Sequence, residues 1–173
     1  MSGFLDSRLW PVAIGIVVVM QAVPAILSAT TRKEGEDWSK DPTASQPAGA
    51  VFAIIWPILY LCLAAAIALV ALWPVAGSSP IARWVVLALL AAEVALNWSW
   101  IPTYGSGNRK GATWVLLAML LVCAPALSLS GYIHPAAQAL IAPYCAWLVF
   151  ALVLTSERNV RDVAQLQQEE EQV

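Results

Sequence analysis

The sequence predicts an all-α membrane protein, a bundle of five transmembrane helices with almost no soluble domain. Of its 173 residues, 60% are hydrophobic and only 12% are charged, whereas about 25% of a soluble domain is charged. A helix needs roughly 20 apolar residues to span a bilayer, and helices satisfy their backbone hydrogen bonds internally in lipid. Five stretches meet this requirement, at residues 9–29, 51–73, 81–103, 112–133 and 137–156.

The first stretch, 9–29, is too long for the apolar region of a secretory signal, and no clean cleavage site follows it. Gln21 and Pro24 interrupt it. We therefore expect a retained transmembrane helix rather than a signal peptide, with a kink at Pro24.

The connections between the later stretches predict which helices are neighbours. Pro74–Pro80 joins the second to the third, and His134–Pro135 joins the fourth to the fifth. Connections this short require antiparallel neighbours. Residues 1–156 therefore form the transmembrane domain, and 157–173 form a polar cytoplasmic tail with a frayed helical end.

The basic residues predict the orientation, because cytoplasmic loops carry an excess of Lys and Arg. One side of the bundle holds only Arg8 and Arg83. The other side holds Arg32, Lys33, Lys40, Arg109, Lys110, Arg158 and Arg161. We expect the N-terminus outside and the C-terminus in the cytoplasm.

The three cysteines are Cys62, Cys123 and Cys145, each in a different apolar run. They show no CxxC or Cys/His spacing. We expect free buried thiols rather than a disulfide or a metal site.

Tryptophan is abundant, with nine residues. Four lie near the ends of apolar runs, where indoles form an interface belt: Trp10, Trp73, Trp84 and Trp114. Four others lie well inside the runs and need another explanation: Trp56, Trp98, Trp100 and Trp147.

Glu93 is an ionisable residue near the centre of the third stretch, where a charge is costly and marks a functional candidate. Asn97 and Trp100 share its helical face. One interpretation is a protonated Glu93 that hydrogen-bonds a neighbouring helix. The other is direct contact with a ligand or with water in a cavity.

Aromatic residues recur on single faces of two other stretches. Trp56 and Tyr60 are four residues apart, and Tyr144 and Trp147 share a face with Ala151 and, further on, Leu154. Such spacing is typical of core packing, but indoles and phenols each carry a donor that needs a partner. Converging with Glu93 and Asn97, these faces predict a mostly apolar pocket for a large flat hydrophobic ligand.

Several function classes are disfavoured. A net charge of −2 argues against nucleic-acid binding. His134 is the single histidine and lies in a tight connection, so no Ser-His-Asp set or metal cluster is expected in the bundle. A Walker-type loop and an inverted repeat are not evident, which argues against an ion-coupled transporter.

Three segments resemble the translocator protein family, also called TspO/MBR, tryptophan-rich sensory proteins or peripheral-type benzodiazepine receptors. Val51–Tyr60 is similar to WVxxxxWxxLY, Ala95–Pro102 to the LN-x-x-W core followed by proline, and Pro143–Ala151 to PYxxWxxxA. The resemblance covers essentially the whole chain, with the segments in family order.

The chain departs from the family in its first connection. Trp38, Pro42 and Pro47 correspond to parts of the usual motif, but the tryptophans after its K-P element are absent, with Ala44 and Ala50 nearby. This loop folds over the ligand in the family, so lid behaviour is not expected to carry over unchanged.

Two further departures lie in the helices. Glu93 stands where the family usually has glutamine. Leu154–Ser156 lacks the tyrosine of the cholesterol motif proposed for animal members. Porphyrin is therefore favoured over sterol.

The resemblance implies a porphyrin-binding five-helix protein that often dimerises; animal members also bind cholesterol and drug-like ligands. We expect binding of a tetrapyrrole, or of a sterol, for transport, sensing or scavenging, with no cofactor required and a porphyrin or haem precursor as the ligand. The expected ligand-binding residues are Trp56, Tyr60, Glu93, Asn97, Trp100, Tyr144, Trp147, Ala151 and Leu154.

Two alternatives stay open. Some bacterial members are reported to promote light-dependent porphyrin breakdown, and tryptophans matching Trp56 and Trp147 are involved, which would make the chain an enzyme. A structural or regulatory bundle, or a homodimer, would use the small-residue face of Ala88, Ala92 and Ala95. Family members occupy the outer mitochondrial membrane, secretory membranes or the bacterial envelope.

Overall fold

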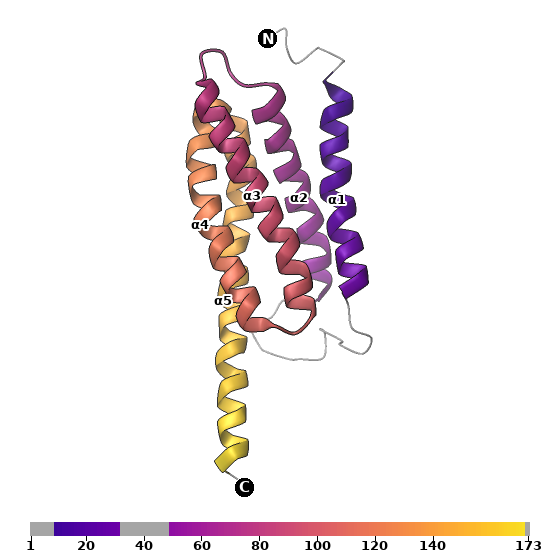
Figure 1. The fold of residues 1–173 in the computed structure, drawn as a ribbon, viewed down its shortest axis with the longest axis vertical. Helices are drawn as coiled ribbons and strands as arrows, with labels where there is room; N and C mark the ends of the chain where they lie inside the picture. The colour runs from indigo at the N-terminus through magenta and orange to yellow at the C-terminus, as the bar shows by residue number, and fades with distance from the viewer. Residues whose placement is uncertain (1–8, 32–48, 172–173) are drawn as a thin grey trace.

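The computed structural model is a bundle of five helices and describes residues 9–31 and 49–171 (Figure 1). The helices are α1 (Trp10–Thr31), α2 (Gly49–Leu72), α3 (Pro80–Gly105), α4 (Arg109–Ile133) and α5 (Pro135–Glu171). Each contains a segment long and apolar enough to cross a membrane. The predicted fold class is therefore confirmed. The first-connection residues Trp38, Pro42, Ala44 and Pro47 lie outside the described residues.

The connection between α3 and α4 is shorter than the sequence predicts. α3 ends at Gly105 rather than Thr103, and α4 begins at Arg109 rather than Ala112. The reason is a local cap, because the Asn108 side chain accepts a hydrogen bond of 2.9 Å from the Gly111 backbone nitrogen. Arg109 and Lys110 therefore lie in the first turn of α4, not in a loop.

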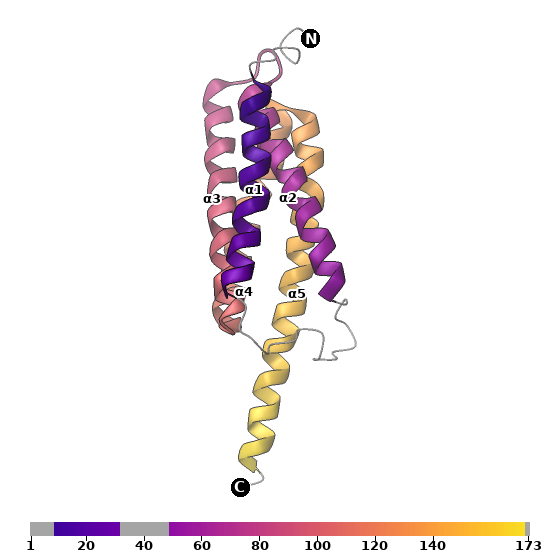
Figure 2. The ribbon, with the colours of Figure 1, turned by 90° about the vertical axis from the view of Figure 1, so that its right-hand side faces the viewer.

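α5 continues well past Ser156, where the predicted transmembrane helix ends, and reaches Glu171. Figures 1 and 2 show this extension projecting beyond the other four helices. Residues 157–171 contain no glycine or proline and are rich in Glu, Gln and Arg, which are good helix formers. The change from apolar to polar sequence therefore marks the end of the bundle but not the end of the helix.

The helices pack in a closed ring in the order α1, α2, α5, α4 and α3, and α3 returns to α1. α2 also touches α3 across the ring. The short connections make α2 and α3, and α4 and α5, antiparallel, as predicted (Figure 1). Between α1 and α2, the Gln21 side chain donates a 2.9 Å hydrogen bond to the Pro57 carbonyl. α1 is one helix through Pro24.

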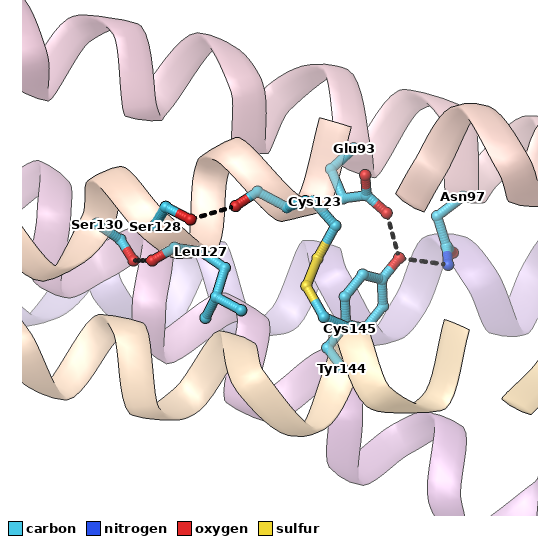
Figure 3. The surroundings of a disulfide bond; sticks show 9 residues. Glu93, Asn97, Cys123, Leu127, Ser128, Ser130, Tyr144 and Cys145 are labelled. Atoms are coloured by element: carbon cyan, nitrogen blue, oxygen red, sulfur yellow. Dashed lines mark hydrogen bonds between the residues drawn. A yellow bond between two sulfur atoms is a disulfide. The ribbon is translucent and has the colours of Figure 1, made fainter. Parts of the chain in front are cut away.

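A disulfide joins Cys123 of α4 to Cys145 of α5, with 6.2 Å between their Cα atoms (Figure 3). The prediction of free thiols is therefore wrong for these two residues, whereas Cys62 is free. The two bonded cysteines are equally far in sequence from His134. In an antiparallel hairpin with a tight turn this places them at the same height, which a search for CxxC spacing overlooks.

Candidate functional site

A chain of hydrogen bonds links four buried polar side chains from α2, α3 and α5. Tyr60 Oη donates to Asn97 Oδ1 at 3.0 Å, and Asn97 Nδ2 donates to Tyr144 Oη at 3.1 Å. Tyr144 Oη in turn donates to Glu93 Oε1 at 2.9 Å. Figure 3 shows Glu93 and Asn97 on either side of the Tyr144 hydroxyl. Each of the four side chains is nearly or fully buried, so the chain is shielded from both lipid and water.

Glu93 has no exposed surface and sits one turn before Asn97 on the inner face of α3. Its bond to Tyr144 ties α3 to α5, so the predicted hydrogen bond to a neighbouring helix is confirmed. Its second oxygen, Oε2, has no hydrogen-bond partner among the described residues. Contact between Glu93 and a ligand stays a prediction.

Three indoles from the same three helices converge beside this chain. The ring centroid of Trp56 on α2 lies 5.6 Å from that of Trp100 on α3 and 6.3 Å from that of Trp147 on α5. Tyr60 packs against Trp56 with centroids 5.5 Å apart, which joins the indoles to the hydrogen-bonded chain. These separations are typical of direct aromatic contact. We call Trp56, Trp100 and Trp147 the indole cluster.

Two further aromatic residues extend the cluster and were not predicted. Tyr104 stacks on Trp100, with centroids 4.9 Å apart and planes tilted by 20°. Phe150 lies 5.2 Å from Trp147. Both follow the predicted residue by one helical turn, so the helical spacing could have found them. Tyr104 was missed because it was assigned to a loop, whereas it belongs to the last turn of α3.

Ala151 and Leu154 occupy the next two turns of α5 after Trp147, and both are buried. Ala151 packs in the main hydrophobic core. Six of the nine predicted residues are thus buried, and the other three, Trp56, Trp100 and Trp147, are half-buried and pack against the core. Seven of the nine are joined by hydrogen bonds or ring contacts, and Ala151 and Leu154 flank that group.

The tryptophans near the helix ends are placed differently. Trp84 on α3 is 64% exposed and Trp114 on α4 is 71% exposed, so both face outward from the bundle. Trp10 and Trp73 contact each other at one end of the α1–α2 pair, with centroids 5.5 Å apart. The division between outer and inner tryptophans was readable from the sequence.

The arrangement offers stacking and dispersion from the indoles, and a polar patch of hydroxyl, amide and carboxyl groups at their side. Among the residues described, no group of three His, Cys, Asp or Glu side chains is placed to hold a metal ion. The indole faces are surfaces on which an apolar ring system can stack.

The sequence matches the TspO/MBR family over residues 13–160. This chain belongs to the TspO/MBR family. The matched range begins three residues into α1 and contains the other four spans and every residue of the site. The family assignment and the apolar helices together make the chain an integral membrane protein.

Curated relatives support the same assignment. The translocator protein of Bos taurus is 30% identical over 150 residues, which cover 84% of this chain and 86% of the relative. That of Ovis aries is 30% identical over 148 residues, with the same two shares. That of Homo sapiens is 29% identical over 150 residues, again covering 84% and 86%. This TspO/MBR chain therefore aligns with its relatives along most of their length.

Proposed function

We propose that this TspO/MBR protein binds a large planar hydrophobic ligand, a tetrapyrrole in preference to a sterol, at the indole cluster. The observation that carries the proposal is the convergence of Trp56, Trp100 and Trp147 from three helices, with ring separations of 5.6 and 6.3 Å. Flat indole faces provide dispersion and stacking for a flat macrocycle, at little conformational cost to the protein. Transport, sensing or scavenging of the tetrapyrrole would follow from such binding.

The buried hydrogen-bonded chain supports the same site. A binding site of this kind is mostly apolar, with a few polar groups that orient the ligand. Tyr60 belongs to both sets, because its ring packs on Trp56 and its hydroxyl bonds Asn97. The Trp100 indole nitrogen is buried without a hydrogen-bond partner in the described part of the chain, and it can donate to an acceptor on a ligand.

The test is a titration of the purified protein with protoporphyrin, followed by tryptophan fluorescence quenching. We expect saturable quenching and a weaker affinity in Trp147→Ala. The matched control is Trp84→Ala, because Trp84 lies exposed on the outside of the bundle and its loss should leave the affinity unchanged. Quenching that never saturates, or equal affinity in Trp147→Ala, rejects the site.

A second candidate function is light-dependent breakdown of the bound porphyrin. The observation that favours it is the edge contact between Trp56 and Trp147, at 6.3 Å and 87° between planes, because a ligand on the indole cluster would then lie next to two redox-capable indoles. Illumination of the complex should then yield a new absorbing product that is lost in Trp147→Phe. Simple bleaching at the rate of free porphyrin excludes this activity.

The outer face of α3 is our proposed contact for a homodimer. Ala88, Ala92 and Ala95 lie there, exposed, and small residues allow close approach of helices in lipid. Ala92→Leu should lower the dimer fraction seen by chemical crosslinking in membranes. An unchanged dimer fraction removes this face as the contact.

We propose that the α3–α4 connection and the extended end of α5 face the cytoplasm. Arg109 and Lys110 lie in the first turn of α4, at the end of the bundle from which α5 projects (Figure 1), and cytoplasmic ends of helices are enriched in such residues. A C-terminal reporter should therefore be cytoplasmic. Its detection on the other side reverses the assignment.

A further inference from the structure

The disulfide between Cys123 and Cys145 lies deep in the membrane-spanning part of the bundle. Cys145 follows Pro135, the first residue of α5, by roughly ten residues, or about 15 Å along the helix. The hydrocarbon layer of a bilayer is about 30 Å thick, so the disulfide lies near its middle. Charged reagents enter this layer only at a high cost. An uncharged, lipid-soluble reagent can therefore reach the depth of the disulfide, whereas a charged reagent in water is kept away.

One of the two bonded cysteines can be approached from the lipid. Cys123 is 1% exposed, whereas Cys145 is half-buried and is followed by the exposed Ala146. Cys145 therefore lies at the edge between the buried and the outer faces of α5. Because disulfide exchange begins with attack on a single sulfur atom, one approachable cysteine is sufficient for the bond to react.

The hairpin of α4 and α5 does not need the disulfide for its topology. The two helices are joined by the short turn at His134, and they pack against each other within the bundle (Figure 1). Opening the bond should therefore leave the hairpin in place. The change that follows is local, in the turn of α5 that carries Cys145.

That turn of α5 also carries residues of the binding site. Tyr144 directly precedes Cys145, and its hydroxyl donates to Glu93 of α3 (Figure 3). Trp147, two residues after Cys145, contacts Trp56 of α2. The disulfide thus ties to α4 the segment of α5 that faces the ligand position. Any freedom gained when the bond opens must be lost again on binding, which lowers the affinity.

We propose that Cys123 and Cys145 form a reversible oxidation site inside the bilayer, which reacts with lipid-soluble quinones and uncharged dithiols, and whose disulfide form binds the planar ligand more tightly. In oxidation two S–H bonds break and the S–S bond forms, while the two protons and two electrons convert a quinone to its hydroquinone. In reduction a dithiol passes its two hydrogens to the cysteines and closes into a cyclic disulfide. The effect on binding rests on the proposed function.

The first part of the test measures access to the pair. It uses full-length Cys62→Ser protein, in which only the pair can react, in phosphatidylcholine nanodiscs that leave both membrane faces open to water. Uncharged dithiothreitol should open the disulfide roughly tenfold faster, or more, than the charged tris(2-carboxyethyl)phosphine. After its removal, a decyl benzoquinone should restore the disulfide and charged ferricyanide should not. Thiols are counted by maleimide–polyethylene glycol labelling after denaturation.

The second part measures protoporphyrin affinity for the disulfide and dithiol forms of the same protein. The dithiol form should bind about fivefold or more weakly, at the lower end of typical coupling between two sites. By linkage, saturating protoporphyrin should shift the dithiol–disulfide equilibrium toward the disulfide by the same factor. The matched control is the double variant Cys123→Ala/Cys145→Ala, whose affinity should equal that of the dithiol form and should not respond to dithiothreitol. If this variant does not fold, the comparison of the two forms still decides.

The outcomes separate this inference from the proposed function. The oxidation site is rejected if both reductants open the bond at the same rate in nanodiscs, if neither opens it, or if the benzoquinone does not restore it. Equal affinity of the two forms for protoporphyrin rejects the inference alone and leaves the proposed function standing. Protoporphyrin that binds neither form rejects the proposed function and the inference together.

Discussion

The inner and outer faces of α3 hold their polar side chains in different ways. The inner face carries Glu93 and Asn97, both buried and bonded to other helices. The outer face carries Ala92 and Ser99, both exposed, and the Ser99 hydroxyl bonds the backbone of its own helix. Lipid offers no hydrogen-bond partners. The polar side chains of α3 therefore either bond to the backbone of their own helix, as Ser99 does, or point inward to other helices, as Glu93 and Asn97 do.

The largest predicted effect is on the free energy of unfolding, and it distinguishes the disulfide-bonded Cys123 from the free Cys62. Cys123→Ser opens a covalent link between α4 and α5, and closing a loop of about this length is worth about 3 kcal/mol in the chain-entropy model. Cys62→Ser should have little effect, because Cys62 is already free. Unfolding of the purified variants in detergent measures both. Alkylation of all three cysteines in denatured, unreduced protein contradicts the disulfide.

The second-largest predicted effect is on the affinity for protoporphyrin. It is compared between an indole of the cluster and an exposed indole on the outside of the bundle. Trp100→Ala removes the ring between Trp56 and Tyr104 and should weaken protoporphyrin binding by about 2 kcal/mol, roughly thirtyfold. Trp114→Ala removes an exposed ring of α4 and should leave binding unchanged. Equal losses in the two variants would mean that porphyrin associates with the outer surface.

The smallest predicted effect is again on the free energy of unfolding. It is compared between Asn97 on the inner face of α3 and Ser99 on the outer face. Asn97→Leu leaves the hydroxyls of Tyr60 and Tyr144 without their shared partner and should lower the free energy of unfolding by about 1–2 kcal/mol. Ser99→Ala, which removes a bond within one helix, should change it by much less. If the two variants unfold alike, the inner chain contributes no stability beyond that of an ordinary polar residue.

Hydrophobic length was sufficient to predict the five spans, because the bilayer imposes it on any helix that crosses. The inward position of Glu93 and Asn97 was also predictable, since neither can face lipid. What the sequence could not supply was the partner of each group. That Tyr60 and Tyr144 both close on Asn97 depends on how α2 and α5 are rotated, and hydropathy does not specify rotation.

The errors have local physical causes. α4 begins three residues earlier than predicted because of a cap at Asn108. The tail predicted as a frayed helical end is helical to Glu171, because helix propensity persists after apolar character ends. The disulfide was overlooked because spacing was judged along the chain, whereas the pairing of Cys123 with Cys145 follows from their heights in a hairpin. Tyr104 was missed because α3 was predicted to end at Thr103, whereas it ends at Gly105.

Binding at the indole cluster is tested most directly by a crystal structure of the complex with protoporphyrin. We expect the macrocycle to lie against Trp56, Trp100 and Trp147, enclosed by α2, α3 and α5 and beside the Tyr60 hydroxyl. A macrocycle bound on the outer surface next to Trp84 or Trp114, with the indole cluster packed as it is without ligand, would contradict it.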